Sequence, residues 1–431
     1  MRILHLIQRY HPARGGAEIY FQEISAYLAA HGHDVTIVTS DALDFERFWL
    51  PHKAAVPTDA PTTHRGVSIR RYPLHHPPLS RLVYPAIRRL LWIFSFLPFI
   101  PVQLSHYLAR FTPWLPNLWY WLESSNEQFD LVAGMTITFD PLLKGGLDFA
   151  RRHQIPFVLY PLTHFGAGPK PASDPLSRFY TLRHQIDIAQ NSDVVVGQTP
   201  TECNFFRQQG LSDDQLMLGG CGIHPKQILG GDADRFRQQY NIQPQTPIVI
   251  CIASMSYDKG VPQLVSAVEQ MWQAGHDIEL ILIGAILDPF RAFLQQRSPQ
   301  TQQRLKLLGH IDDNTKKDAL AAATLMAMPS RTDSFGIAYL EAWVYGKPVI
   351  AARTWGVMDV VQHEKNGLTV PFDDQEALIA AINRLINNPD EAAHFGTIGR
   401  QQVYDRYNWP FQCARILDLY TNLHARNHRP A

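Results

Sequence analysis

The sequence is poor in cysteine and has no excess charge of either sign. Its four cysteines are isolated, with no C-x-x-C pair and no metal-ligand spacing. Isolated cysteines in a long chain indicate reduced, buried thiols rather than a disulfide framework or a zinc site. The 39 lysines and arginines balance 39 aspartates and glutamates. A neutral chain lacks the basic face that binds nucleic acid, so we expect no nucleic-acid partner.

Long apolar runs are also absent. The longest one, residues 90–102, contains two prolines and is too short to span a bilayer. The first apolar stretch ends at Pro12, so we expect no signal peptide. Together with the free thiols, this predicts a cytoplasmic protein, with peripheral contact at the inner face of the membrane as an open alternative.

Short apolar runs of strand length alternate with segments of helical spacing. In the first half of the chain the runs lie at residues 2–7, 34–40, 129–135, 155–162 and 192–199. In the second half they lie at residues 248–254, 278–285, 305–311, 324–330 and 348–352. Strand–helix–strand order implies crossover connections and a parallel sheet. The predicted fold class is therefore α/β, with two Rossmann-like doubly wound domains and a ligand-binding cleft between them.

The rhythm of these runs also predicts the domain bounds. The first domain covers residues 1–225, and a polar stretch then leads into a second domain over residues 226–408. The end of the chain, residues 409–431, is predicted to be a helix that packs back on the first domain. Two domains suit a chain of 431 residues, of which 45% are apolar and 18% charged.

Residues 75–125 interrupt the alternation and predict a helical insertion rich in aromatic residues, proline and arginine. One interpretation is a packed helical hairpin that covers the acceptor groove of an enzyme. The other is an interfacial surface that meets anionic lipid. The second interpretation uses Trp92, Phe96, Trp114 and Trp119 together with Arg81, Arg88 and Arg89.

The segment "RTDSFGIAYLEAW", residues 331–343, carries two acids, Asp333 and Glu341. A helix starting at residues 334–336 offers free N–H groups to an anion, and Gly336 allows close approach. Eight helical residues would separate the acids by about 12 Å, too far for one acid/base pair. They would then hold two parts of a long ligand such as a sugar nucleotide. The plainer alternatives are a helix cap for Asp333 and an exposed helix position for Glu341.

Residues 329–352, "PSRTDSFGIAYLEAWVYGKPVIAA", resemble the E-x7-E segment of the retaining glycosyltransferases of family 4, which have the GT-B fold. "GGAE", "DKG" and "NGLTVPFDD" extend the resemblance over nearly the whole chain. It implies a retaining transferase that moves a sugar from a nucleotide-diphosphate sugar to a hydroxyl acceptor, in polysaccharide or glycolipid synthesis. The acceptor would be a glycan or lipid-linked molecule on the first domain, and the second domain would bind the nucleotide sugar.

The resemblance also implies roles for residues of the second domain. Asp333 matches the acid beside the transferred sugar, and Lys259 would neutralise the departing diphosphate. Glu341 would hydrogen-bond the donor ribose. The backbone of Phe335, Gly336 and Ile337 would contact the sugar and diphosphate, and Gly309 would lie near the base, beside His310.

Two further motifs follow strands of the first domain. Gly15 and Gly16 form a tight turn at a helix start, suited to phosphate or sugar. Their spacing is not G-x-G-x-x-G, so a dinucleotide fingerprint is absent. His164 follows a strand end, where the resemblance implies contact with the donor sugar. His11 and Arg9 are weaker candidates.

The chain departs from the family pattern at two positions. Ser254 stands where an arginine is usual, and Asp333 is one methylene shorter than the usual glutamate. Arg331 or Arg353 would compensate for the missing cation. These departures keep two alternatives open: a catalytically weak nucleotide-sugar-binding protein, or a GT-B nucleotide-sugar epimerase. We expect no metal cofactor, because we find no convincing D-x-D metal motif and Lys259 with helix N-termini would supply the positive charge.

Overall fold

The computed structural model describes residues 1–427 and divides into two compact units. The first unit comprises Met1–Thr163, Pro175–Gly220 and the chain from Pro410 onward. The second comprises His164–Asp174 and Cys221–Trp409. The segment His164–Asp174 thus packs with the second unit, although the strand before it belongs to the first. Residues 428–431 of the predicted terminal helix lie outside the described residues.

The sheet of the first unit has eight strands in the order β3-β4-β2-β1-β5-β6-β7-β8. All neighbours are parallel except β3 and β4. The strands are β1 (Arg2–Leu6), β2 (Asp34–Ser40), β3 (Thr63–His64), β4 (Val67–Tyr72), β5 (Leu131–Met135), β6 (Phe157–Tyr160), β7 (Val194–Gly197) and β8 (Leu216–Leu218).

The five strands predicted for this unit are confirmed, and they are the buried apolar ones. Strands β3, β4 and β8 were not predicted. β4 contains two arginines, and β3 and β8 are only two and three residues long. Their apolar pattern is therefore too weak to distinguish them from loops.

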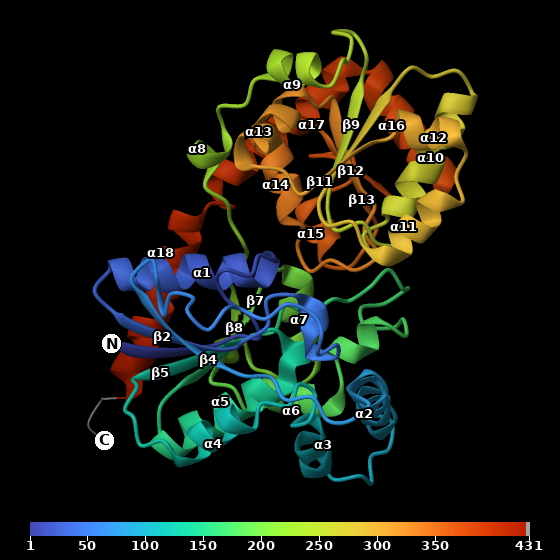
Figure 1. Ribbon diagram of the computed structural model, residues 1–431. Helices are drawn as coiled ribbons and strands as arrows, with labels where there is room; N and C mark the ends of the chain where they lie inside the picture. Colours follow the sequence, from blue (N-terminus) through green and yellow to red (C-terminus); the bar gives the residue numbers. More distant parts are fainter. Residues whose placement is uncertain (428–431) are drawn as a thin grey trace. The chain divides into compact units, whose positions relative to one another are not determined.

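Eight α-helices of the first unit are described (Figure 1). They are α1 (Gly16–Ala30), α2 (Ser80–Phe94), α3 (Val102–Ala109), α4 (Pro116–Ser124), α5 (Asp140–His153), α6 (Arg183–Gln190), α7 (Pro200–Gln208) and α18 (Trp409–Asn427). Helices α2, α3 and α4 make up the insertion. Helix α18 is tied to the sheet by Tyr420, whose hydroxyl lies 3.2 Å from His5 Nε2 and 3.1 Å from the Tyr160 hydroxyl.

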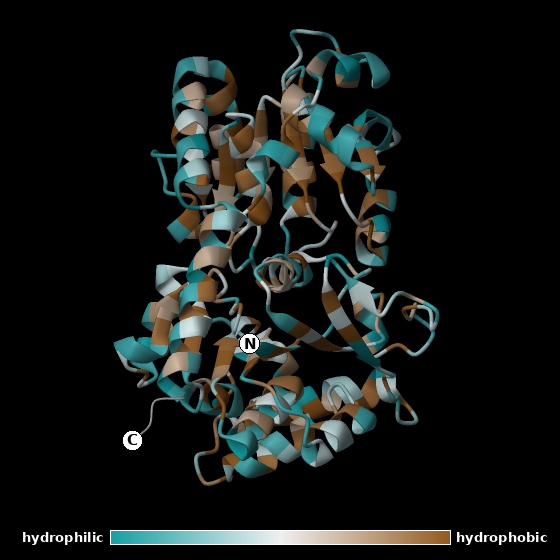
Figure 2. Cartoon of the chain, turned by 90° about the vertical axis from the view of Figure 1, so that its left-hand side faces the viewer, coloured by the Kyte–Doolittle hydropathy of each residue, from teal (hydrophilic) through white to brown (hydrophobic). Residues whose placement is uncertain are grey.

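The second unit has six parallel strands in the order β11-β10-β9-β12-β13-β14. They are β9 (Ile248–Ile252), β10 (Glu279–Ile283), β11 (Lys306–Gly309), β12 (Leu325–Met328), β13 (Val349–Ala352) and β14 (Leu368–Val370). The first five were predicted, and the three-residue β14 was not. Figure 2 shows apolar residues concentrated in the strands of both sheets, as parallel sheets covered on both faces require.

Ten α-helices of the second unit are described, and two of them lie in the polar stretch that follows the first unit. They are α8 (Pro225–Ile228), α9 (Ala233–Gln239), α10 (Val261–Gln273), α11 (Asp288–Gln295), α12 (Pro299–Arg304), α13 (Asp313–Ala322), α14 (Ile337–Val344), α15 (Val357–Val360), α16 (Gln375–Asn387) and α17 (Pro389–Asp405). The sheet order reverses between β9 and β12, where doubly wound sheets bind ligands at the carboxyl ends of their strands.

Candidate functional site

Two loops meet at the reversal point of the second sheet, one after β9 and one after β12. The carbonyl of Asp258 in the first loop accepts hydrogen bonds from the backbone of Arg331 at 2.8 Å and Thr332 at 3.3 Å. Gly260 has φ +70°, and a Cβ there would lie 2.1 Å from the Pro329 carbonyl. Glycine at this position therefore lets the two loops pack in direct contact.

This packing brings Lys259 and Asp333 together. Lys259 Nζ lies 2.8 Å from Asp333 Oδ2 and also donates to the Thr332 carbonyl at 3.3 Å. Burial alone would raise the pKa of Asp333, but the charge and hydrogen bond of Lys259 outweigh it and hold this pKa below its ordinary value. The structure therefore places an ionised carboxylate and a cation side by side at the edge where ligands bind.

Asp333 is not the cap of the following helix. Helix α14 begins at Ile337, and its N-cap is Gly336 with φ +88° and no side-chain cap. Residues 333–336 are not helical, so the expected helical spacing of about 12 Å between the two acids does not apply. A Cβ on Gly336 would lie 2.4 Å from the Tyr339 ring, which explains why glycine opens this helix.

Glu341 is not an ordinary exposed helix residue either. It lies one turn after Ile337 on the face of α14 that is left uncovered by the core. Its Oε1 accepts a hydrogen bond from Lys316 Nζ on α13 at 2.6 Å. Sequence reasoning missed Lys316 as the partner of this predicted site residue. Only the helical phase of "DNTKKDAL" could have indicated which of its two lysines faces α14.

His164 lies in the part of the second unit that comes from the loop after β6. Burial is the main cause that lowers its pKa to about 4, the charge of Lys259 lowers it further, and the charges of Asp333 and Asp258 oppose the change. His164 is therefore neutral at pH 7 and offers a hydrogen bond, not a charge. Because the charges of Lys259 and Asp333 both act on the pKa of His164, the three predicted catalytic residues lie near one another.

The remaining predicted donor contacts lie at element ends of the second unit. Phe335 is buried and packs edge-to-face on Tyr407, with ring centroids 5.4 Å apart, so only its backbone is available to a ligand. Gly309 ends β11 with φ +64°, and its carbonyl accepts a hydrogen bond from Gly284 at 2.8 Å. Donor contacts by Phe335, Gly336, Ile337 and Gly309 stay predictions.

The predicted glycine turn of the first unit lies after β1, next to a buried acid. A Cβ on Gly15 would lie 2.3 Å from Glu18 Oε2, so glycine lets this carboxylate fold against the start of α1. Arg9 Nε donates to Glu18 Oε1 at 2.9 Å. The helix start therefore already carries a paired carboxylate, which the sequence analysis did not foresee. Anion or sugar contact by Gly15 and Gly16 stays a prediction.

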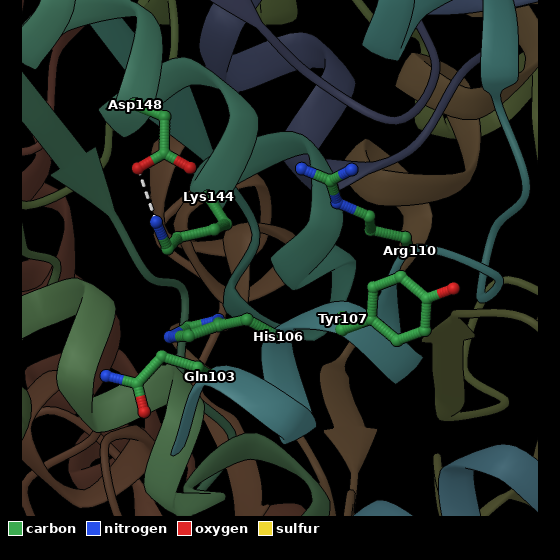
Figure 3. A pocket seen from close by; sticks show the side chains of 6 residues that line it. All are labelled: Gln103, His106, Tyr107, Arg110, Lys144 and Asp148. Atoms are coloured by element: carbon green, nitrogen blue, oxygen red, sulfur yellow. Dashed lines mark hydrogen bonds and ion pairs between the residues drawn. The ribbon is translucent and has the colours of Figure 1, made fainter. Parts of the chain in front are cut away.

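Two hollows of the first unit border the insertion. One of about 270 Å³ lies between α3 and α5, where Lys144 and Asp148 form an ion pair in its wall (Figure 3). The other, of about 600 Å³, adjoins the loop between α2 and α3 and includes Arg183. Neither hollow is lined by a predicted site residue. Among residues 1–427, no helix combines the length and apolarity needed to cross a bilayer.

Comparison with known proteins follows the same division of the chain. The model described as "Glycosyl transferase 4-like domain" matches residues 15–222, and that described as "Glycosyl transferases group 1" matches residues 232–402. The chain belongs to glycosyltransferase family 4. The resemblance read from the E-x7-E segment is thereby confirmed.

Curated relatives in the family align over part of their length. A GDP-mannose-dependent monoacylated alpha-(1-6)-phosphatidylinositol monomannoside mannosyltransferase of Corynebacterium glutamicum is 28% identical over 195 residues, 44% of this chain and 50% of that protein. An alpha-maltose-1-phosphate synthase of Mycolicibacterium smegmatis is 27% identical over 191 residues, 42% of this chain and 49% of that protein. The chain thus spans about half the length of the curated relatives it matches.

Solved structures of similar fold align over nearly the whole chain. Sucrose-phosphate synthase from Thermosynechococcus elongatus has a TM-score of 0.71 at 21% identity and covers 99% of both chains. Anabaena HepE, solved in complex with UDP, has a TM-score of 0.69 at 20% identity, covering 98% of this chain and 100% of that one. At this identity the likeness establishes the fold, which is GT-B with two Rossmann-like units, as predicted.

Against the family 4 pattern, the structure shows what surrounds the missing arginine. Ser254 is exposed in the loop after β9. Arg331 is already paired, because its Nη2 lies 2.6 Å from Asp258 Oδ1. The exposed guanidinium of Arg353 makes no ion pair within the part of the chain that is described. Of the two residues predicted to compensate for the missing arginine, Arg353 is therefore the one whose charge is available to a ligand.

Proposed function

We propose that this protein is a retaining glycosyltransferase that transfers a sugar from a nucleotide-diphosphate donor to a hydroxyl acceptor. The observation that carries the proposal is the Lys259–Asp333 pair at the reversal point of the second sheet, in a chain of family 4. An ionised pair at the carboxyl edge of a doubly wound sheet suits a ligand with both a charged and a hydroxylated part.

In this proposal Lys259 stabilises the diphosphate as negative charge develops on it. The cation is held 2.8 Å from Asp333, so it is oriented before the donor arrives. Asp333 accepts a hydrogen bond from the transferred sugar, and neutral His164 donates one to it. Glu341, oriented by Lys316, accepts from the ribose hydroxyls. The donor phosphate assists deprotonation of the incoming hydroxyl on the face that the leaving group departs from, which retains the anomeric configuration.

We propose a glycan or lipid-linked acceptor and a place in polysaccharide or glycolipid synthesis. The protein would act in the cytoplasm, with peripheral contact at the inner face of the membrane. The curated relatives offer partial support, since one of them is named as acting on a phosphatidylinositol monomannoside. No metal is required in this scheme, because Lys259 supplies the charge that would otherwise come from a cation.

The test is product analysis with UDP-, GDP- and ADP-sugars, with and without hydroxyl acceptors. Transfer or slow donor hydrolysis, with the released sugar first appearing in the anomeric form of the donor, is the expected result. Lys259→Met should lower kcat/KM about 100-fold or more, because one preorganised charge at a leaving group contributes that order of magnitude. Donor binding without turnover would instead identify a nucleotide-sugar-binding protein. Conversion of the donor sugar without acceptor would identify an epimerase.

A further inference from the structure

Helix α2 of the insertion is apolar on two opposite faces. Its inner face includes the fully buried Leu91 and the buried Arg88, whose Nη1 lies 2.8 Å from Asp140 Oδ2. Its outer face exposes Leu82 at 66% and Ile93 at 43%, eleven residues and about three turns apart. A helix that covers a core ordinarily turns a polar face outward. Packing within the first unit therefore does not account for the outer face of α2.

The exposed apolar surface continues beyond this helix. Leu79, just before α2, is 73% exposed, and Phe99, in the loop that leads to α3, is 75% exposed. Phe96 and Leu104 are exposed as well. We call the six residues Leu79, Leu82, Ile93, Phe96, Phe99 and Leu104 the apolar face of the insertion. Isolated exposed apolar residues are common on proteins, but six on one helical hairpin mark an interaction surface.

The stretch of sequence that carries this face has charge of one sign. Between Asp59 and Glu123 the sequence contains seven arginines and no acidic residue. Arg81 and Arg89 are exposed on α2, and neither pairs with a carboxylate within residues 1–427. Arg89 lies over the Trp92 ring at 5.7 Å. Four other arginines of this stretch do pair with acids, all of which lie outside it. The pairs are Arg65 with Glu23, Arg70 with Glu127, Arg88 with Asp140 and Arg110 with Glu123.

We propose that the apolar face of the insertion docks on the surface of an anionic lipid bilayer. Leucine and aromatic side chains bury in the interface between head groups and acyl chains, while unpaired arginines hold anionic head groups. A second copy of this chain is a poorer fit, because a symmetric contact would bring Arg81 and Arg89 of both copies together. The proposal rests on the proposed function for its setting: a transferase held at a bilayer meets acceptors that are carried by lipid.

The experiment is flotation of the full chain with vesicles of phosphatidylcholine, with or without phosphatidylglycerol, in the absence of any donor. The protein should float with the anionic vesicles, and binding should weaken as salt rises. Arg81→Glu/Arg89→Glu should weaken vesicle binding at least roughly 30-fold, because each basic residue near an anionic surface is worth about fivefold. Leu82→Asp/Phe99→Asp should weaken it at least about tenfold. Both side chains are mostly exposed, so the thermal unfolding temperature should stay unchanged.

Tyr404→Asp is the matched control, since Tyr404 is 42% exposed on α17 of the second unit. It should leave vesicle binding unchanged. Absence of flotation with anionic vesicles overturns the proposal, and so does an equal loss in Tyr404→Asp. Self-association that Leu82→Asp/Phe99→Asp abolishes, measured by sedimentation without lipid, would assign the face to a second copy. The flotation assay contains no donor, so its failure would not contradict the transferase proposal. Absence of sugar transfer would likewise not contradict vesicle binding.

Discussion

Removing the cation from the Lys259–Asp333 pair should destabilise the second unit, and the loss should depend on pH. Asp333 is only 14% exposed, and apart from Lys259 its carboxylate accepts, among residues 1–427, one long hydrogen bond from the Phe335 amide at 3.4 Å. Removing one partner of a buried ion pair costs about 3–5 kcal/mol of stability. Because this pair keeps some exposure, we expect Lys259→Met to lower the free energy of unfolding by about 3 kcal/mol. For a unit of about 200 residues this lowers Tm by about 6–12 °C.

Substituting the other partner of the pair, Asp333, should lower the free energy of unfolding by less. In Asp333→Asn the ammonium of Lys259 is 28% exposed, so it contacts water and still donates a hydrogen bond to the Thr332 carbonyl. We therefore expect the free energy of unfolding to fall by about 1 kcal/mol. The double variant leaves no unpaired charge and should lose about 2 kcal/mol. The coupling energy of the pair is then about 2 kcal/mol, within the range for hydrogen bonds to charged groups.

The pH dependence has a definite sign. The pKa of Asp333 is lowered in the folded protein, so its contribution is full above the unfolded pKa of about 4 and is lost as pH falls through the folded pKa. Without Lys259, burial dominates and the folded pKa rises. The difference in unfolding free energy between the wild type and Lys259→Met should therefore shrink from pH 7 to pH 4.

The assay is urea unfolding of the four proteins at both pH values. On the Asp333→Asn background, the effect of Lys259→Met should change much less with pH, because what remains is the weaker influence of Lys259 on the pKa of His164. A coupling energy below about 0.5 kcal/mol, or an equal loss at pH 7 and pH 4 in the single Lys259 variant, would refute the reasoning.

Three more predictions follow from the same edge of the second unit. Gly336→Ala should lower the unfolding free energy by about 3 kcal/mol, because φ is +88° and the new Cβ would meet the Tyr339 ring. Gly346→Ala is its control: φ is +66° with nothing within 4 Å, so urea unfolding should show a loss of only about 1 kcal/mol. Glu341→Gln should raise the donor KM about tenfold with little change in kcat, and equal KM values in steady-state assays would count against a ribose contact. Ser254→Arg should tighten nucleoside-diphosphate binding about tenfold by calorimetry, and unchanged affinity would show that residue 254 does not face the diphosphate.

Most of the strands could be predicted because parallel strands are buried on both faces and read as apolar runs. The exceptions have physical reasons. Strand β14 is three residues long and lies in "NGLTVPFDD", where glycine and proline leave no run to count. Strand β4 carries Arg70, whose guanidinium pairs with Glu127 from a distant segment. No local pattern indicates such a partner.

At the candidate site, residue types and the family 4 resemblance led to the predicted roles of Lys259, Asp333 and Glu341, and these roles stay predictions. The residue pattern also predicted a helix after Asp333, but with the wrong start and with a cap role as the plain alternative. The true start at Ile337 depends on Gly336 adopting a positive φ against the Tyr339 ring. That conformation is set by packing, which periodicity does not describe.

The sequence by itself determined the α/β class, the series of two parallel sheets and the family, because these follow from burial period and from short motifs. Only the tertiary structure decided the partner of each acid. Lys259 and Asp333 are 74 residues apart and meet because β9 and β12 are neighbours in the sheet. Lys316 on α13 likewise reaches Glu341 on α14, 25 residues further along the chain. An ion pair requires contact within a few ångströms, and strand order, not local sequence, determines which loops come that close.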